Sequence, residues 1–259
     1  MSQAEHEIEP VPTHEPRGGD LVRRHSLVTR LWHWTNLVAV TVMLMSGLMI
    51  FNAHPRLYWG AFGANPDRAW LDFTNVGGGR PFPGWATIPS GYSLADARLW
   101  HFAFAWLLMI AIAGYLLWSL ISGHIKRDLA PRAAELAPAH SWYDIKYHAR
   151  LRFPTGVAAL RYNILQKLAY GSVLFLLLPG VVLTGLTMSP AMNAAWPWVL
   201  ALLGGRQSAR SLHFLCAAGL VAFFIVHIAM VVLAGPINEL RSMLSGWYRL
   251  PSEPLAEDT

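Results

Sequence analysis

The sequence predicts an all-α integral membrane protein, a four-helix bundle with a long outer loop and a cytoplasmic connecting segment. Of its 259 residues, 54% are hydrophobic and only 14% are charged, a balance typical of membrane proteins. A bilayer core about 30 Å thick requires roughly 20 apolar residues per helix. Four segments meet this length, at about 31–51, 99–121, 168–188 and 211–234.

The distribution of basic residues predicts the orientation of these helices. Fourteen of the 20 Lys and Arg residues lie in the N-terminal region, in the connection between the second and third segments, and in the C-terminal region, against six in the two other connections. By the positive-inside rule both termini are cytoplasmic. We therefore expect a multi-pass membrane protein in contact with lipids. The net charge of +5 follows from this topology and does not indicate nucleic-acid binding.

The chain divides into a membrane domain and two terminal segments. Residues 1–20 are rich in Glu, Pro and Gly, so we expect a disordered cytoplasmic N-terminus. The four-helix domain covers 21–240, and 241–259 form a cytoplasmic tail, frayed after Trp247. Within the third segment Pro179 predicts a kink, because proline removes one hydrogen bond of the helix. The segment YNILQKLAY (162–170) is expected to be a helix that leads into this span.

The connection at 52–98 is predicted to lie outside and to be irregular, because it contains VGGGRPFPGW. Connections of this length are functional or disordered. Two interpretations stay open, a docking platform for a partner and a lid that rests on the membrane. A further apolar run, 196–204, is too short to cross the bilayer and is expected at its interface. The aromatic residues that favour an ordered surface at 52–98 are Tyr58, Trp59, Phe62, Trp70, Phe73, Phe82, Trp85 and Tyr92.

The single cysteine, Cys216, excludes several kinds of metal centre. The sequence has no CxxCH motif for covalent haem and no cysteine set for an iron–sulfur cluster or a zinc site. Cys216 lies within an apolar segment, where we expect it to be a small packing residue.

Two histidines in the last apolar segment, His213 and His227, are candidate metal ligands. Fourteen residues at 100° per residue turn through about 1400°, within about 40° of a whole number of turns, so both rings share one helix face. At 1.5 Å per residue they are about 21 Å apart along the axis. They are therefore too far apart to share a metal and suitably placed to bind two.

Partners occur at the same depths in other segments. His33 lies near the cytoplasmic end of the first segment and His101 near the outer end of the second, which pairs His33 with His227 and His101 with His213. Pairs of imidazoles across a helical bundle are the axial ligands expected for haem b. Histidines bonded to backbone carbonyls are the alternative. Four buried imidazoles at matched depths argue against it, since ionisable groups in a bilayer are costly.

The other histidines are weaker candidates. His54 could replace His101 or His213, but Pro55 indicates that it has left the helix, and His25 could rival His33. We expect His124, His140 and His148, in the cytoplasmic connection, to be solvated or involved in proton uptake.

An arginine precedes three of the four ligand candidates by three residues. These are Arg30, Arg98 and Arg210, in RLWH, RLWH and RSLH. The spacing places each Arg on the face of its histidine, one turn closer to the membrane surface. Contact with haem propionates and ordinary snorkelling to the interface both stay open.

Four motifs carry a resemblance to a known family. HWTN (33–36), RLWHFAFAW (98–106), YxxxxxxLLPGVVLTGL (170–186) and RSLHFLCAAGLVAFFIVHIAM (210–230) resemble the diheme cytochrome b subunits of bacterial nickel–iron hydrogenases and membrane-bound formate dehydrogenases. They are also similar to proteins described as thiosulfate reductase cytochrome b subunits. The resemblance covers about 25–235 and implies that His33, His101, His213 and His227 ligate two b haems. It also implies that a quinone meets one haem, on the cytoplasmic side next to His227 in formate dehydrogenase relatives. The long 52–98 connection departs from the hydrogenase subunits.

These observations lead to the hypothesis of an electron-transfer subunit of an oxidoreductase complex in the bacterial inner membrane. Electrons would pass through two haem b groups between a periplasmic redox subunit and the membrane quinone pool. A molybdenum oxidoreductase is the preferred partner, with a hydrogenase or a soluble cytochrome c second, and a homo-oligomer is compatible with the sequence. For the quinone we single out Asn163, Gln166 and Lys167, with Tyr162 and Tyr170 nearby; the alternative for these polar residues is helix-end solvation. Two other classes stay open, a stand-alone oxidoreductase linking quinone and oxygen species, and a haem-free membrane anchor or transporter.

Overall fold

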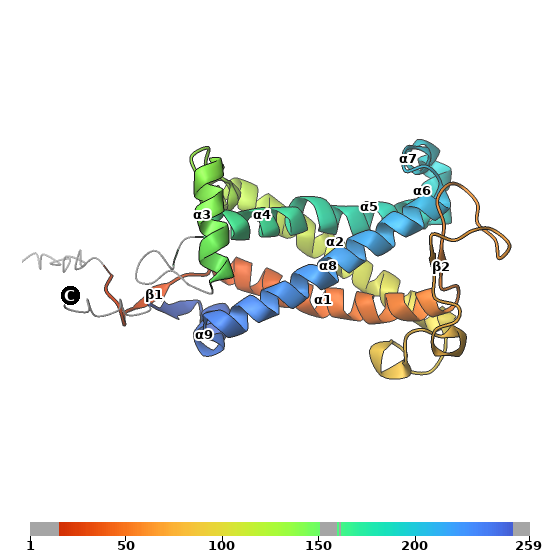
Figure 1. The fold of residues 1–259 in the computed structure, drawn as a ribbon, viewed down its shortest axis with the longest axis horizontal. Helices are drawn as coiled ribbons and strands as arrows, with labels where there is room; N and C mark the ends of the chain where they lie inside the picture. The colour runs from red at the N-terminus through yellow and green to blue at the C-terminus, as the bar shows by residue number, and fades with distance from the viewer. Residues whose placement is uncertain (1–15, 151–159, 161, 251–259) are drawn as a thin grey trace, which may run out of the picture.

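The computed structural model describes residues 16–150, 160 and 162–250. Within them four long helical segments run alternately in opposite directions (Figure 1). All four are long and apolar enough to cross a membrane, which confirms the predicted all-α membrane bundle. They are α1 (Leu27–Asn52), α2 (Leu94–Ile121), a composite of α4 (Ile164–Ser172) and α5 (Leu178–Met188), and α8 (Arg206–Ala234).

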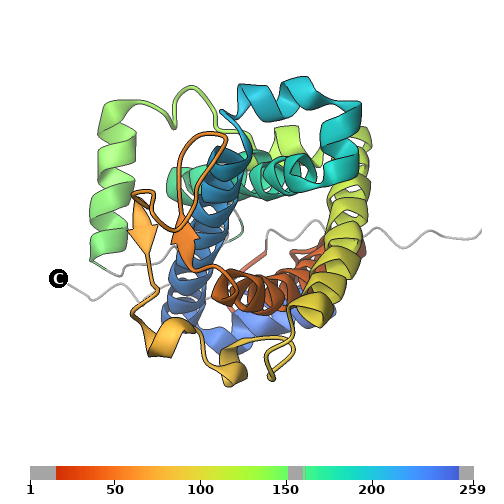
Figure 2. The same ribbon diagram turned by 90° about the vertical axis from the view of Figure 1, so that its right-hand side faces the viewer.

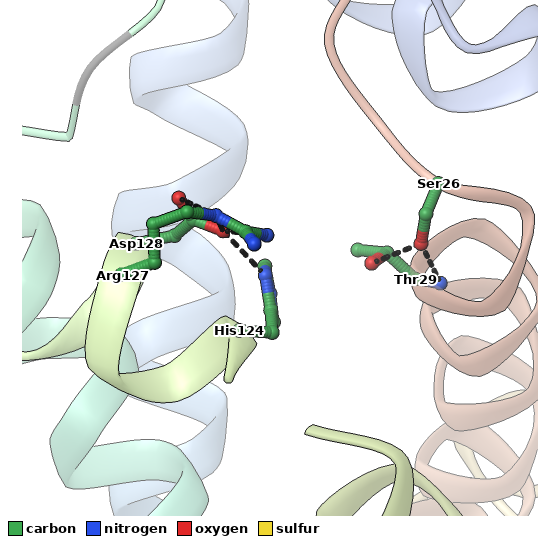
Figure 3. Close-up of polar contacts among 5 residues, drawn as sticks. All are labelled: Ser26, Thr29, His124, Arg127 and Asp128. Atoms are coloured by element: carbon green, nitrogen blue, oxygen red, sulfur yellow. Dashed lines mark hydrogen bonds and ion pairs between the residues drawn. The ribbon is translucent and has the colours of Figure 1, made fainter. Parts of the chain in front are cut away.

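Each spanning segment begins four or five residues earlier than the apolar pattern predicted, and in the first three spans polar capping residues extend the helix. The Ser26 side chain accepts a hydrogen bond from the Thr29 backbone N–H at the start of α1 (3.1 Å; Figure 3). Ser93 does the same for α2. At the start of α4, Asn163 and Gln166 form a capping box. Such caps satisfy N–H groups that have no partner inside the helix.

The third span is irregular in its middle. A π-helical turn, η5 (Val173–Leu177), separates α4 from α5, and Pro179 stands at the first turn of α5. Proline has no N–H to bond to the carbonyl four residues earlier, and a widened turn accommodates this loss. The distortion predicted at Pro179 therefore takes the form of a π-helical turn.

The four spans pack as two pairs, α1 against α2 and α5 against α8, around a shared centre (Figure 2). Ala39, Leu108, Ile112 and Leu178 form a buried cluster between them. Large apolar side chains also cover the outside of the spans, Ile225 of α8 being 62% exposed. Apolar residues on all sides of a helix are expected where its outer face meets lipid.

One end of the bundle, which we call the loop end, carries the connection at 53–93. Strands β2 (Arg56–Leu57) and β3 (Leu71–Asp72) pair antiparallel there, and two 3-10 turns follow, η1 (Gly77–Gly79) and η2 (Gly84–Ala86). Two short helices, α6 (Pro190–Ala195) and α7 (Pro197–Leu202), lie at the same end. The α7 segment is six residues long, too short to cross a bilayer, as expected for 196–204.

The connection at the loop end is fastened to the first turns of α8. The Gly60 carbonyl accepts hydrogen bonds from the Gln207 and Ser208 backbone N–H groups (3.0 and 3.1 Å), and the Gly60 N–H donates to Ser208 Oγ (2.7 Å). One turn later, Ser211 Oγ donates to the Tyr58 carbonyl (2.6 Å). The carbonyl of Gly60 thus caps the N-terminus of α8.

The opposite end, which we call the terminal end, holds both described ends of the chain (Figure 1). Strand β1 (Leu21–Arg23) pairs antiparallel with β4 (Trp247–Arg249). Helix α9 (Pro236–Ser245) follows α8, and η3 (Ile125–Leu129) and α3 (Pro138–Ala149) follow α2. Residues 241–259 were expected to form a tail that frays after Trp247. Helix α9 extends to Ser245, and Trp247–Arg249 form β4 because the strand before α1 supplies a partner. Residues 1–15 and 251–259 lie outside the described residues.

Candidate functional site

The four histidines singled out in the sequence form two pairs, one toward each end of the bundle. At the terminal end, His33 of α1 faces α8, and its ring centroid is 6.3 Å from that of His227. Toward the loop end, the ring centroids of His101 on α2 and His213 on α8 are 6.1 Å apart. The structure therefore brings together the two pairs that helix depth predicted, and their role as metal ligands stays a prediction.

The ring separations fit a metal held between two imidazoles. Metal–imidazole bonds are about 2.0 Å long, and a ring nitrogen lies roughly 1.2 Å from its ring centre, so two imidazoles on one metal have centroids about 6.4 Å apart. Both observed separations lie within a few tenths of an ångström of this value.

The number of ligands distinguishes haem iron from other metal centres. Among the described residues, no group of three or more His, Cys, Asp or Glu side chains could hold a metal ion. Structural zinc and iron–sulfur centres require about four protein ligands. A haem iron would need only two ligands from the protein, which a histidine pair could supply.

Contacts from neighbouring helices surround the pair toward the loop end. His101 Nδ1 lies 3.1 Å from Ser46 Oγ and 3.1 Å from the Met43 carbonyl, both on α1. His213 Nδ1 lies 3.0 Å from Thr184 Oγ1 on α5. Gly47 and Gly185 stand beside the two rings, where an added Cβ would lie 3.4 Å from the Cε1 of His101 or His213. These residues were not predicted from the sequence, although both sites share the pattern Ser/Thr–Gly–Leu (46–48 and 184–186) inside an apolar span.

The pair at the terminal end has an aromatic environment instead. His227 stacks on Phe223, one turn earlier on α8 (centroids 5.7 Å apart), and Phe223 contacts Tyr170 edge-on. His33 contacts Trp34 edge-on. The His33 Nδ1 atom is buried and has no hydrogen-bond partner within the described residues.

Two of the three arginines bind backbone carbonyls in this structure. Arg30 donates to the Met243 carbonyl (3.4 Å) and to the Leu244 carbonyl, which ties α1 to α9. Arg210 donates to the Arg56 carbonyl (3.0 Å) and to the His54 carbonyl. Arg98 is exposed, and its guanidinium lies 5.7 Å from the Phe102 ring centroid. A guanidinium has five N–H donors, more than these carbonyls use, so the same arginines could also bind haem propionates. That contact stays a prediction for all three.

The rival histidines have other partners. His54 follows the end of α1, as Pro55 predicted, and stacks on Tyr58. His25 is buried ahead of α1; burial, and then the positive charge of Arg24, lower the pKa of His25 to about 4, so the ring is neutral at pH 7.

In the connection after α2, the described histidine ring, that of His124, is not solvated as was expected. His124 Nδ1 pairs with the Asp128 carboxylate at 2.7 Å (Figure 3), and its ring packs on Trp118. The His124 side chain is only 13% exposed, because the η3 turn folds it back against α2. His140 and His148 lie on α3, and their side chains are outside the described part of the chain.

The three polar residues predicted for quinone binding lie together at the start of α4, and each has a partner in the protein. Asn163 and Gln166 form the capping box, and the buried Lys167 ammonium pairs with both Glu135 carboxylate oxygens at 2.8 Å. A hydrogen bond from the Arg132 backbone, and then Lys167, lower the pKa of Glu135. Tyr162 and Tyr170 pack edge-on beside these residues. The quinone role stays a prediction.

Comparisons with known proteins identify the family of the chain. Residues 24–246 match the family described as prokaryotic cytochrome b561. A relative from Azospira oryzae, which carries the name protein-methionine-sulfoxide reductase subunit YedZ1, is 31% identical over 79% of this chain and 87% of its own length. Two Ni/Fe-hydrogenase B-type cytochrome subunits are similar, at 26% identity in Cupriavidus necator (84% of this chain, 83% of the relative) and 24% in Azotobacter vinelandii (89% and 92%).

No solved structure matches the chain significantly. The family match extends from just before α1 to the end of α9, and so includes all four spans and both histidine pairs. The resemblance to hydrogenase cytochrome b subunits is confirmed by these relatives. The chain therefore belongs to the prokaryotic cytochrome b561 family, the haem-containing electron-transfer subunits of membrane oxidoreductases.

Proposed function

We propose that this chain conducts electrons across the membrane through two b haems, one held by His101 and His213 and the other by His33 and His227. The observation that carries the proposal is the repetition of one geometry, with ring pairs 6.1 and 6.3 Å apart toward opposite ends of the same four helices. About 21 Å of helix separates His213 from His227. Two carriers at these depths would divide the membrane crossing into shorter steps.

The haems, when bound, supply the one-electron chemistry, and the chain supplies position and environment. Each histidine pair joins two helices, so the bundle fixes the distance between the two rings. The apolar spans exclude water from the rings and thereby influence the potential of the metal that they hold. An arginine near each propionate would stabilise its negative charge.

We assign the loop end to the periplasm and the terminal end to the cytoplasm, on the distribution of basic residues. A catalytic redox subunit then docks at the loop end of the bundle. Relatives that carry the names of methionine-sulfoxide reductase and hydrogenase subunits support a partner of this kind. A molybdenum oxidoreductase is our first choice for this chain, and a hydrogenase the second.

A quinone is proposed to meet the pair at the terminal end, His33 and His227. The aromatic residues between His227 and the start of α4, which are Phe223, Tyr170 and Tyr162, form an apolar surface suited to a quinone ring. The capping box uses Gln166 Oε1 as an acceptor, so the NH₂ group of the same amide is the donor we would assign to a quinone carbonyl. Asn163 and Lys167 would contribute only by exchanging their present partners.

The test is to count haems in the purified chain after single histidine substitutions. His101→Ala or His213→Ala should each halve the haem content measured as pyridine haemochrome, and His33→Ala or His227→Ala should halve it by removing the other haem. The double variant His213→Ala/His227→Ala should bind none.

Matched controls are His54→Ala at the loop end and His25→Ala at the terminal end, which should both retain two haems per chain. Two haems in His213→Ala, or loss of haem in His54→Ala, would contradict the assignment. Reduction of haem by a quinol in the unmodified chain, and its loss in His227→Ala, would support the quinone at the terminal end. Turnover by the purified chain with quinol and oxygen at the rate of the native membranes would instead indicate a stand-alone oxidoreductase.

A further inference from the structure

Each ring of the pair toward the loop end has a hydroxyl group and a glycine beside it, from α1 for His101 and from α5 for His213. Ser46 of α1 approaches His101 Nδ1, and Thr184 of α5 approaches His213 Nδ1, at 3.1 and 3.0 Å. His101 Nδ1 also lies 3.1 Å from the carbonyl of Met43, three residues before Ser46. A glycine follows each hydroxyl residue and lies beside the Cε1 of the ring.

The direction of these hydrogen bonds follows from the groups involved. Ser46 Oγ donates its hydrogen to the Val42 carbonyl at 2.7 Å, and Thr184 Oγ1 donates to the Gly180 carbonyl at 2.6 Å. A hydroxyl has one hydrogen, so toward the imidazole each oxygen acts as an acceptor. The Met43 carbonyl can only accept as well. The Nδ1 atoms of His101 and His213 therefore carry hydrogen, and each Nε2 has its lone pair available for a metal.

The pair at the terminal end lacks this arrangement. Within the described residues, no hydrogen bond joins a hydroxyl or a carbonyl to the ring of His33 or His227, and Phe223 and Trp34 contact the rings instead. The two pairs thus have the same spacing and different surroundings.

Building on the function proposed above, we infer that Ser46 and Thr184 are positioning residues that lower the midpoint potential of the haem held by His101 and His213. An imidazole whose Nδ1–H is held by an acceptor is a more basic ligand. A more basic ligand stabilises ferric iron relative to ferrous iron. The hydroxyls therefore make the two haems unequal and also fix the orientation of the rings that bind one of them.

The test is a redox titration of the purified chain with Ser46→Ala and with Thr184→Val. Each substitution removes one acceptor at nearly constant volume, and each should raise the midpoint potential of one haem. We expect a change of roughly three- to tenfold in the ferric-to-ferrous equilibrium, tenfold being about 59 mV for one electron. The potential of the other haem should not move. The His227→Ala variant, in which only the His101/His213 haem is expected, identifies the haem that responds.

Controls separate this role from simple packing. Thr184→Ser keeps the hydroxyl and should retain the original potential. Thr187→Val, one turn along α5, and Ser119→Ala, on α2, alter equally buried residues outside the pair and should leave both potentials unchanged. Loss of one haem in Thr184→Val, with both retained in Thr184→Ser and Thr187→Val, also supports the positioning role.

Two results would overturn the inference. Two bound haems with unchanged potentials in both Ser46→Ala and Thr184→Val would refute the role of the hydroxyls and leave the proposed function intact. An unmodified chain that binds no haem would refute the proposed function, and this inference with it. The haem count, made before the titration, distinguishes the two failures.

Discussion

Replacing Gly205 with alanine should destabilise the attachment of the loop end to α8. Gly205 precedes α8 with φ +101° and ψ 177°, a backbone conformation open essentially to glycine alone. A Cβ there would lie 2.6 Å from Ala61 Cα, 2.8 Å from Ala61 N and 2.9 Å from the Gly60 carbonyl oxygen. These are backbone atoms, so the connection itself would have to move. Its Gly60 carbonyl would then lose the hydrogen bonds that cap α8.

The loss of stability in Gly205→Ala has two contributions, the unfavourable backbone conformation and the collision of the Cβ with Gly60 and Ala61. The conformation costs about 1–3 kcal/mol for a residue other than glycine, and the collision adds about 1–3 kcal/mol. Gly60→Ala is the matched control, because Gly60 lies on the other side of the same contact and also has a positive φ, +94°. A Cβ on Gly60 would meet no atom within 4 Å. The difference between the two variants isolates the collision. At about 2–4 °C per kcal/mol, Gly205→Ala should melt about 2–12 °C below Gly60→Ala.

Thermal unfolding of the purified chain in detergent, followed by far-ultraviolet circular dichroism, measures this difference. A Gly205→Ala variant as stable as Gly60→Ala would refute the reasoning, because it would mean that the connection does not press against the start of α8.

Two further predictions concern orientation and a buried charge. The first uses single cysteines introduced into a Cys216→Ser background. Phe62→Cys at the loop end, where Phe62 is 89% exposed, should react with a membrane-impermeant maleimide added from the periplasm, and Trp142→Cys on α3 should react only after the membrane is permeabilised. The reverse pattern would show that the assigned topology is inverted. Glu135→Gln should lower the melting temperature more than Lys167→Met, because it alone leaves a buried ammonium unpaired, at a cost of up to about 3–5 kcal/mol. Since the pKa of Glu135 is lowered in the folded chain, its contribution is present at neutral pH and is lost as the pH falls through that pKa.

The sequence predicted the spans and the histidine pairs because both depend on helix periodicity and depth. Four apolar segments define four helices, and a fourteen-residue spacing places His213 and His227 on one face. The helix boundaries were less accurate, since Ser26 and Ser93 are polar and extend the helices beyond the apolar residues. Hydropathy identifies apolar residues and therefore does not identify polar N-cap residues.

Other parts of the site depend on contacts between helices, which the sequence does not specify. Ser46 and Thr184 resemble ordinary span residues that bond to the carbonyl four positions earlier, and only the packing of α1 on α2 and of α5 on α8 brings them to His101 and His213. The strand pair β1–β4 is only three residues long on each side and has too few positions to show an alternating pattern. Arg30 could not be assigned either, because its carbonyl partners belong to α9.

The pairing of β1 with β4 joins the segment before α1 to the segment after α9. The Gly246 carbonyl accepts hydrogen bonds from the Arg24 and His25 backbone N–H groups, directly ahead of the helix that carries His33. A truncation that removes Trp247–Arg249 would therefore release Leu21–Arg23 as well and disturb the entry to α1. Loss of haem after such a C-terminal deletion would therefore reflect a disturbed α1 and not a haem ligand in the deleted segment. A deletion of Leu21–Arg23 is the control needed to interpret it.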